Sequence, residues 1–472
     1  MIGRINETRV LRGAYESEQS EFVALYGRRR VGKTFLVTEF FNGRFSFHHA
    51  GIEGASKKET LSSFREALKR QGHPKCPRLM TWVHAFAELE TLLDGRRESR
   101  KVVFMDELPW YDTPKSGFLR AFESFWNGWA SVRRDIVLVI CGSATTWIID
   151  KVVKNRGGLH NRVTRQLPIA PFTLRECEEF ATYKHLDFDR RQLAECYMAL
   201  GGVAYYWSLL QEGLSAAQNF DRLFFGVADE MRNEYERVFA SLFRSPTRHM
   251  AIVEMLGTRQ TGLTREEIVA GLPEGSGGEV TRSLEELCQC GFVRRYHAIG
   301  KAKKGSIYQL IDNYVLFYFR FLRNRKGTDE HFWSLSYSTP AVNNWRGLAF
   351  ERVCMWHVPQ IRTALGISGI VTDVYSWRGR KTDDGGRPLQ IDMLLDRGDN
   401  MIDICEMKFS AGEYELDADE NRRLMERMET FRRQTGTRKG TRTVLISAFG
   451  LKRGKYAGNI QSVVTLGDLF RG

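Results

Sequence analysis

The sequence lacks long apolar runs. None of its segments approaches the roughly 18 consecutive apolar residues that a membrane-spanning helix needs, and the opening residues, Met1 to Glu7, lack the apolar stretch of a secretory signal. Internal repeats and low-complexity segments are also missing. We therefore expect a soluble, cytoplasmic protein with no membrane partner.

Cysteines are few and scattered. There are 8 of them, and Cys288 with Cys290 is the only close pair. No second pair or histidine cluster completes the spacing of a zinc site. This pattern predicts reduced, buried thiols rather than a disulfide framework or a zinc module.

Apolar and charged residues are plentiful. The 472 residues suggest about three domains, and 42% hydrophobic with 27% charged residues is typical of a globular chain with ample core material. The net charge of +13 suits an acidic partner such as nucleic acid. Many basic proteins bind none, so the charge alone does not decide.

The first third alternates apolar runs with helical patterns, which predicts an α/β domain with a parallel sheet over residues 1–172. The candidate strands are Phe22–Tyr26, Phe45–Ala50, Val102–Met105 and Ile136–Cys141. Most are nearly continuous apolar runs, as strands buried on both faces should be. Residues 173–244 are rich in Leu, Phe and Tyr and predict a helical lid.

Residues 245–325 carry the pattern of a winged helix followed by one more helix. Thr264 and Glu267 form a capping box at the start of one helix. The other expected parts are helices His249–Leu256 and Glu279–Cys290, a lysine-rich tip Gly300–Gly305, a strand Ser306–Ile311 and the helix Tyr314–Arg325. Such a module binds either DNA or a protein partner, and the sequence favours DNA only slightly.

Residues 326–472 predict a second α/β domain, in the order α-β-β-β-α-β. Its expected elements are a helix Asn343–Pro359, strands near Ile370–Trp377, Leu389–Asp396 and Met401–Phe409, a basic helix Asp419–Gln434 and a strand Thr443–Ala448.

The octapeptide Gly27 to Thr34 fits the phosphate-loop pattern G-x-x-x-x-G-K-[ST]. Glycines let backbone amides approach phosphate closely, and the helix that follows points its positive end at the same charge. Lys33 would reach the β- and γ-phosphates, and the Thr34 hydroxyl would ligate Mg²⁺. The pattern predicts ATP as the cofactor.

Downstream, the apolar strand that begins at Lys101 ends in two carboxylates. Asp106 would hold the Mg²⁺ water shell, and Glu107 would orient or deprotonate the attacking water. A third apolar strand ends at Ser143, which could sense the γ-phosphate or simply cap the strand. Arg162 follows in a basic loop that is either solvated or in reach of the phosphate.

These segments together resemble the archaeal-type ATPase family, which belongs to the AAA-like, signal-transducing (STAND) P-loop ATPases. The resemblance rests on Ile2-Gly3-Arg4, Gly27–Thr34, Asp106-Glu107-Leu108-Pro109-Trp110 and Cys141-Gly142-Ser143. It implies that Gly3 and Arg4 lie near the adenine and that Arg162 matches a family arginine. Ala204, in Gly201-Gly202-Val203-Ala204, stands where the family's lid motif has proline. The expected nucleotide-binding residues are Gly3, Arg4, Gly27, Arg30, Val31, Gly32, Lys33, Thr34, Phe35, Asp106, Ser143 and Arg162.

A second site is predicted near the C-terminal end. Alternation along a strand puts Glu406 and Lys408 on one face, and a hairpin would bring Asp392 beside Glu406. Two carboxylates can share Mg²⁺ or Mn²⁺, while Lys408 orients a bound water. Glu351, on the preceding helix, is a fourth candidate. The set resembles the PD-(D/E)xK nuclease superfamily and implies a restriction-endonuclease-like domain, although a salt-bridged strand surface would look the same.

The leading hypothesis is an ATP-binding and ATP-hydrolysing protein that couples nucleotide state to metal-dependent cleavage of nucleic acid, with DNA favoured. The alternative is an ATP-dependent switch that binds DNA or protein without cutting, through the winged helix and a non-cleaving nuclease-like domain. A scaffold ATPase whose basic charge is incidental is a third reading. An oligomer is compatible with each of them.

Overall fold

The computed structural model describes residues 2–154, 157–227, 230–243, 245–259, 261–272, 277–296, 306–325, 327, 329–379 and 389–471. The predicted lysine-rich tip at Gly300–Gly305 lies outside these residues. The chain divides into two compact units, Met1–Pro171 and Phe172–Gly472. The finer division into lid, winged helix and C-terminal domain stays a prediction.

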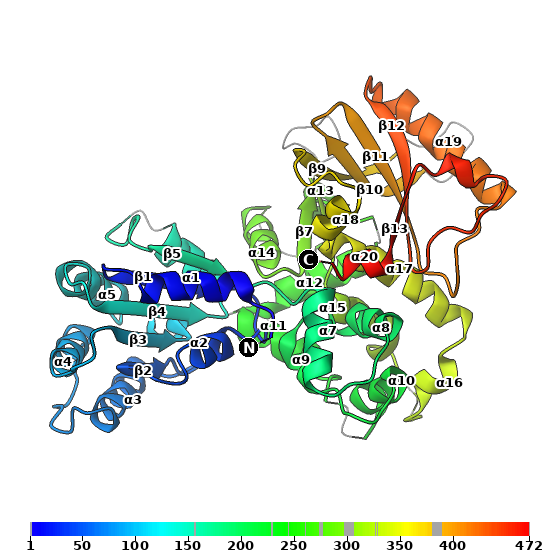
Figure 1. Ribbon diagram of the computed structural model, residues 1–472. Helices are drawn as coiled ribbons and strands as arrows, with labels where there is room; N and C mark the ends of the chain where they lie inside the picture. Colours follow the sequence, from blue (N-terminus) through cyan, green and yellow to red (C-terminus); the bar gives the residue numbers. More distant parts are fainter. Residues whose placement is uncertain are drawn as a thin grey trace. The chain divides into compact units, whose positions relative to one another are not determined.

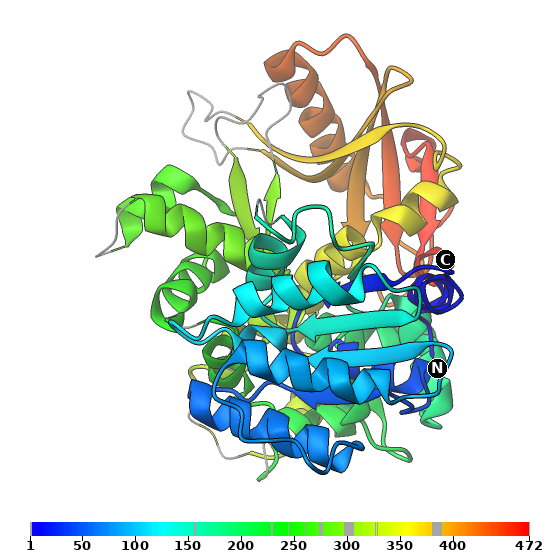
Figure 2. The same cartoon turned by 90° about the vertical axis from the view of Figure 1, so that its left-hand side faces the viewer.

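The first unit is built on a parallel five-stranded sheet in the order β2-β3-β4-β1-β5 (Figures 1 and 2). Its strands are β1 (Glu21–Tyr26), β2 (Phe47–Ala50), β3 (Lys101–Asp106), β4 (Ile136–Gly142) and β5 (Arg165–Pro168). Every residue of β3 and β4 is buried, as their unbroken apolar runs predict. Sequence analysis did not predict β5, an edge strand with one buried residue among its four.

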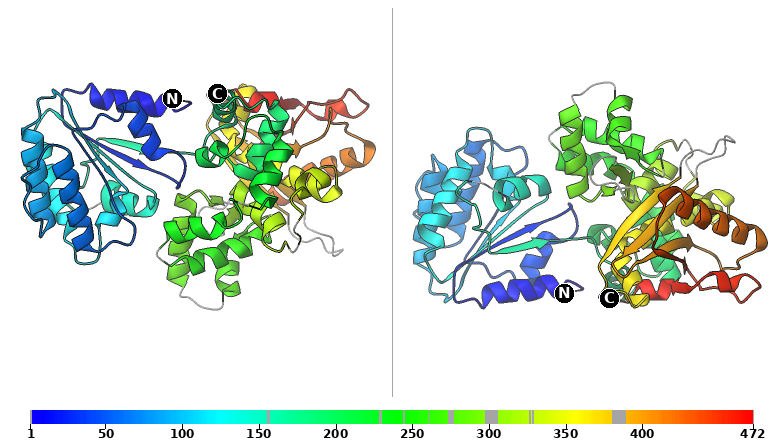
Figure 3. Two further views of the ribbon diagram at one scale, coloured as in Figure 1. Left: turned by 90° about the horizontal axis from the view of Figure 1, so that it is seen from below. Right: turned by 90° about the horizontal axis from the view of Figure 1, so that it is seen from above.

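Helices cover both faces of this sheet (Figure 3). One apolar layer joins strand residues such as Phe22 and Leu138 to α3 (Lys57–Arg70), α4 (Trp82–Asp94) and α5 (Phe118–Phe125). The other joins the alternate strand residues, such as Val23 and Val139, to α1 (Ile5–Tyr15) and α2 (Lys33–Phe40). Both faces of the sheet are therefore withdrawn from water, which leaves the carboxyl ends of the strands for chemistry.

The second unit begins with a group of helices. They are α7 (Leu174–Tyr183), α8 (Arg190–Leu200), α9 (Ala204–Ser208), α10 (Ala216–Phe220) and α11 (Glu234–Leu242). Gly202 lies between α8 and α9, where a Cβ atom would stand 1.9 Å from the carbonyl oxygen of Phe172. Only glycine allows this close approach of two backbones, which explains the second glycine of the Gly-Gly pair.

Three helices and a small antiparallel sheet follow. They are α12 (Pro246–Gly257), α13 (Arg265–Gly271), α14 (Gly277–Gln289) and the strands β6 (Leu263–Thr264), β7 (Val293–Tyr296) and β8 (Ile307–Leu310), in the order β6-β8-β7. The Thr264–Glu267 capping box is present at the start of α13. The helix predicted over Tyr314–Arg325 is α15 (Asn313–Phe317), which continues into a π-helical turn at Tyr318–Leu322.

The rest of the second unit is a mixed five-stranded sheet in the order β13-β12-β11-β10-β9 (Figure 1). The strands are β9 (Thr372–Arg378), β10 (Gln390–Arg397), β11 (Met401–Lys408), β12 (Gly440–Ser447) and β13 (Ser462–Thr465). Strands β9, β10 and β11 pair antiparallel, whereas β11, β12 and β13 pair parallel.

Two long helices pack on opposite faces of this sheet. Phe350 and Val353 of α17 (Pro340–Trp356) join a core with Met393 and Cys405. The other core is formed by α19 (Ala418–Thr435), whose Phe431 packs with strand residues of the opposite parity, among them Leu394, Ile402 and Ile404. Within the described ranges, no helix combines the length and apolarity that crossing a membrane requires.

Candidate functional site

The loop from Gly27 to Thr34 joins β1 to α2 and has the backbone of an anion-binding nest. Gly27 (φ 147°), Arg30 (φ 70°) and Gly32 (φ 89°) lie in the left-handed region. A Cβ atom on Gly27 would stand 2.3 Å from the Ile169 carbonyl oxygen, so glycine is required there. Successive amides of such a loop turn toward one point, and the N-terminus of α2 adds its dipole.

Lys33 is buried and folds back over this loop. Its Nζ donates hydrogen bonds to the carbonyl oxygens of Gly27, at 2.9 Å, and Arg28, at 2.8 Å. Val31 is buried beneath the loop, while Phe35 is exposed beyond it. The ammonium group is therefore held at the same loop whose amides would meet a phosphate.

Thr34 and Asp106 meet at the carboxyl edge of the parallel sheet. The Thr34 hydroxyl donates a hydrogen bond to Asp106 Oδ2 at 2.8 Å, and the Glu107 amide donates to Asp106 Oδ1 at 2.8 Å. Asp106 is buried at the end of β3, whereas Thr34 is exposed. A hydroxyl and a carboxylate side by side are a donor set that fits Mg²⁺.

Glu107 follows Asp106 in a strained conformation. Its φ of 46° and ψ of 50° place a non-glycine residue in the left-handed region, which is uncommon and costs about 1–3 kcal/mol. Its carboxylate accepts hydrogen bonds from the amide and the hydroxyl of Ser143, at 3.0 and 2.9 Å. The ends of the two adjacent strands β3 and β4 are thus tied together beside the phosphate loop.

The remaining residues predicted to bind nucleotide differ in whether they contact the phosphate loop. Gly3 and Arg4 have positive φ at the start of α1, and Arg4 Nη2 donates to the Val31 carbonyl oxygen at 3.1 Å. This bond brings the N-terminal segment to the loop. Arg162 is exposed in the turn before β5, and within the described ranges no hydrogen bond or ion pair joins its side chain to the loop.

In the second unit, Asp392 lies at a β-bulge of β10. The pairing with β9 shifts between Ile391 and Leu394, so that Asp392 and Met393 oppose Ser376 alone. Ser376 Oγ donates to the Asp392 carbonyl oxygen at 2.6 Å. Bulges of this kind redirect side chains and are frequent beside active sites.

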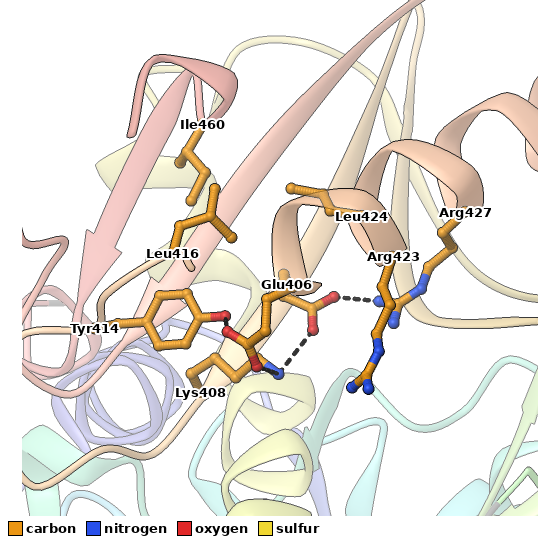
Figure 4. A pocket seen from close by; sticks show the side chains of 9 residues that line it. Glu406, Lys408, Tyr414, Leu416, Arg423, Leu424, Arg427 and Ile460 are labelled. Carbon is orange, nitrogen blue, oxygen red and sulfur yellow. Dashed lines mark hydrogen bonds and ion pairs between the residues drawn. The ribbon is translucent and has the colours of Figure 1, made fainter. Parts of the chain in front are cut away.

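Glu406 and Lys408 lie on the neighbouring strand β11. Met393 pairs with Cys405, so Asp392 and Glu406 occupy the next positions of the same hairpin. Lys408 Nζ contacts Glu406 Oε1 at 3.1 Å, and Arg427 of α19 forms an ion pair with Glu406 Oε2. Figure 4 shows the Glu406 carboxylate between these two cations. The three side chains line a cavity of about 70 Å³.

Glu351 of α17 completes this group. Burial, helped by the carboxylates of Asp392 and Glu406 and opposed by the cations of Arg352 and Lys408, raises the pKa of Glu351 to about 8. For Lys408, burial lowers the pKa, but the carboxylates of Glu406 and Glu420 outweigh it and the pKa is raised. The four predicted residues therefore act on one another electrostatically, from one helix and two strands.

Arg294 on β7 was not among the predicted site residues. Its Nη2 donates to Ser376 Oγ at 3.0 Å and its Nε to Gln309 Oε1 at 2.7 Å. Burial, together with the nearby Arg352 guanidinium and against the opposing charge of Asp392, lowers the pKa of Arg294 to about 10. No local signal could have found it, because Arg294 and Asp392 lie 98 positions apart in the sequence.

One further cluster was not predicted. In the described part of the chain, His73, Cys76 and Glu88 form the one group of three metal-ligating side chains whose ligand atoms all lie within 4.8 Å of one another. Glu351, Asp392 and Glu406 do not converge to that degree. A hydrogen bond between His73 Nε2 and Glu88 Oε2 already accounts for two members of the cluster.

No protein-family model matches the sequence. An uncharacterized protein of Methanocaldococcus jannaschii, MJECL04, is 24% identical over 364 residues, which cover 75% of this chain and 76% of that protein. Among solved structures, the Walker-type ATPase paby2304 of Pyrococcus abyssi has a TM-score of 0.51 at 16% identity, over 68% of this chain and 96% of that one. The ORC2 protein of Aeropyrum pernix has a TM-score of 0.37 at 14% identity, over 65% of this chain and 89% of that one. This likeness is too low to bear on the fold.

The likeness to the Pyrococcus protein shows the fold. The chain is an α/β protein with a parallel five-stranded sheet like that of a P-loop ATPase, and with a C-terminal mixed-sheet domain of unassigned kind.

Proposed function

We propose that the chain binds ATP with Mg²⁺ at the loop Gly27–Thr34 and hydrolyses it. The observation that carries this proposal is the 2.8 Å hydrogen bond between the Thr34 hydroxyl and the Asp106 carboxylate, beside a loop that holds Lys33. Lys33 would neutralise the phosphates, while Thr34 and Asp106 would hold the Mg²⁺ ion, which supplies charge compensation when bound.

Glu107 would act on the attacking water. Its carboxylate is held by Ser143 at the edge of the sheet, next to the residues that would hold the cation. A carboxylate in this position can accept a proton from water. Ser143 would sense the γ-phosphate, because it contacts the group that acts on the water.

The test is steady-state ATP hydrolysis with a matched pair of variants. Glu107→Gln keeps the shape of the side chain but removes the base, so we expect ATP binding to persist while the hydrolysis rate falls about 100-fold or more. Glu98→Gln changes an exposed carboxylate outside the site and leaves the rate unchanged. Hydrolysis by Glu107→Gln at the rate of the unmodified protein rejects the role of Glu107.

We propose, as a second function, that Glu351, Asp392, Glu406 and Lys408 form a metal-dependent site that cleaves nucleic acid, in a restriction-endonuclease-like domain. The supporting observation is that Asp392 and Glu406 occupy neighbouring positions of one hairpin, with Lys408 Nζ 3.1 Å from Glu406 Oε1. Carboxylate oxygens are the ligands that Mg²⁺ and Mn²⁺ prefer. A cation there would supply a nucleophilic water and offset charge on the phosphate.

The donor set fits a divalent cation on one condition. Glu406 is neutralised by Arg427 and Lys408 in the present arrangement, so a cation must displace one of these contacts. Arg427 would then be free to meet a phosphate of the substrate. DNA is the favoured substrate, in keeping with the net charge of +13.

The cleavage assay uses linear and supercoiled DNA with Mg²⁺ or Mn²⁺, and it compares two protein variants that each carry one substitution in β10. Asp392→Asn removes a proposed ligand, so cleavage should fall to background. Asp396→Asn, four residues further on, changes a carboxylate that pairs with Lys439 instead and should leave cleavage intact. Salt-sensitive binding without cleavage in any metal would favour the alternative, an ATP-dependent switch that binds DNA or a protein partner.

Both sites belong to one chain, and we propose that nucleotide state controls cleavage. DNA cleavage measured with ATP, with ADP and without nucleotide tests this coupling. Cleavage that differs between these conditions in the unmodified protein, but not in Lys33→Ala, supports the coupling. Cleavage that is equal in all conditions rejects it and leaves both activities independent.

A further inference from the structure

The second unit contains a cavity of about 480 Å³ that neither proposed activity uses. It lies among α8, α12, α15, the turn at Tyr318–Leu322 and α17. Its size falls within the range of about 300–1,000 Å³ that is usual for small-molecule sites. All of its lining residues belong to the same compact unit.

The lining of the cavity is strongly cationic. It includes Arg259, Arg320 and Arg352, and no aspartate or glutamate is among the described residues that form it. Arg259 and Arg320 are exposed, whereas Arg352 is only 4% exposed. Guanidinium groups recognise phosphate and carboxylate oxygens. The charge therefore suits an anionic ligand that enters past two arginines and reaches a third.

Asn313 gives the cavity a polar group that lacks one hydrogen bond. The side chain is 4% exposed, and its Nδ2 donates to the Tyr197 carbonyl oxygen at 2.7 Å. Its Oδ1 is buried without a hydrogen-bond partner in the described part of the chain. Leaving such an acceptor unpaired costs about 1–3 kcal/mol, so a ligand that carries an N–H donor would restore a missing bond.

Two aromatic side chains, Phe319 and Trp345, also line the cavity. Flat rings stack well on such surfaces. We propose that this cavity is a second nucleotide site, which takes a nucleoside monophosphate whose base bears an exocyclic amino group. The arginines would bind the phosphate, the aromatic rings would pack on the base, and Asn313 Oδ1 would accept from the amino group.

The cavity is also linked to the carboxylates of the C-terminal site, through the side chain of Arg352. Arg352 lines the cavity, and the residue before it on α17 is Glu351, whose Oε2 lies 3.9 Å from Arg352 Nη1. An anion that binds Arg352 weakens its hold on Glu351 and changes the charge around Asp392. A nucleotide in the cavity would thereby act as an effector of cleavage, a consequence that rests on the proposed nuclease function.

Binding is tested on full-length Lys33→Ala protein, in which the phosphate loop is disabled. Equilibrium binding of AMP, CMP, IMP and UMP is measured by calorimetry. We expect AMP and CMP, which carry the amino group, to bind about tenfold or more tighter than IMP and UMP, a difference of about 1.4 kcal/mol. Competition of AMP with a short oligo(dA) strand then tells whether the nucleotide is free or part of a strand, and either result supports nucleotide recognition.

Two exposed arginines provide variants that should still fold. Arg259→Ala with Arg320→Ala should weaken AMP binding about tenfold or more, while Arg282→Ala, which removes an exposed guanidinium of α14 that is 81% accessible, should not. Absence of AMP and CMP binding at millimolar concentration overturns the proposal, as does binding that the Arg259–Arg320 double variant leaves unchanged. Neither result decides whether the chain hydrolyses ATP or cleaves DNA, because separate assays test those two proposals.

Discussion

The hydroxyl of Thr34 donates a hydrogen bond to the carboxylate of Asp106 at 2.8 Å, although the two residues are 72 positions apart. One stands at the start of the helix after β1, and the other at the end of β3. The parallel sheet brings both to the same edge. This contact links the phosphate loop directly to the acidic end of the strand.

Replacing Thr34 tests whether this edge holds a cation. Thr34→Val removes the hydroxyl and keeps the shape, so the Mg²⁺-dependent part of ATP affinity should fall about tenfold or more. Calorimetry with and without Mg²⁺ measures it. Thr38→Val, one turn further along α2, is the matched control and should behave like the unmodified protein. An unaltered Mg²⁺ dependence in Thr34→Val would remove the hydroxyl from the site.

Stability should depend on pH through Glu351. Because the pKa of Glu351 is raised from 4.5 to about 8 in the folded protein, the folded state binds more protons than the unfolded state between these values. The free energy of unfolding therefore decreases as pH rises through this window, by at most about 1.4 kcal/mol per pH unit from this group. Urea unfolding of the unmodified protein and Glu351→Gln at several pH values measures the difference.

Glu351→Gln should lose this part of the pH dependence and be the more stable protein above about pH 8. Bound Mn²⁺ favours the ionised carboxylate, so the metal should flatten the trend in the unmodified protein. Equal slopes for the two proteins would show that Glu351 does not titrate in this window.

Removing Arg427 should strengthen metal binding. Arg427 forms an ion pair with Glu406 Oε2 and competes with a cation for that oxygen. Arg427→Gln is thus expected to raise Mn²⁺ affinity about tenfold in nucleotide-free protein, as measured by electron paramagnetic resonance. Arg432→Gln changes an exposed arginine of the same helix that does not line the cavity beside Glu406 and serves as the control. Equal affinities in both variants would argue against a cation at Glu406.

A buried ion pair should control the stability of the second unit. Arg346 of α17 lies 3.3 Å from Glu195 of α8, and both side chains are at most 4% exposed. Arg346→Met leaves the buried Glu195 carboxylate with Arg191 and the Tyr337 hydroxyl as its remaining partners and should cost about 3 kcal/mol in urea unfolding. Arg471→Met, at an exposed pair with Asp468, should cost less than about 1 kcal/mol. Similar losses in the two variants would contradict this assignment.

The sheet of the first unit could be predicted because burial on both faces leaves an unbroken apolar run, as in β3 and β4. Strand β5 escaped prediction since Leu167 is its one buried residue. The helix predicted over Tyr314–Arg325 was right in place, but its π-helical turn at Tyr318–Leu322 has no signature in side-chain spacing. Local patterns record burial and say little about backbone irregularities.

The site residues also divide into those that a local motif reveals and those that only the folded chain brings together. The phosphate loop is one contiguous motif, so its residues could be named from the sequence. The contacts of Arg294 with Ser376, and of Arg427 with Glu406, join elements that only the folded chain brings together. The bulge at Asp392 likewise depends on the pairing of two strands. Tertiary contacts of this kind leave no trace in residue spacing.

The most direct test of ATP binding is a crystal grown with Mn²⁺ and a non-hydrolysable ATP analogue, examined by anomalous scattering. We expect the triphosphate against the loop of residues 27–34 and a manganese peak beside the Thr34 hydroxyl, near Asp106. A triphosphate bound elsewhere, or no manganese at this edge of the sheet, would contradict it.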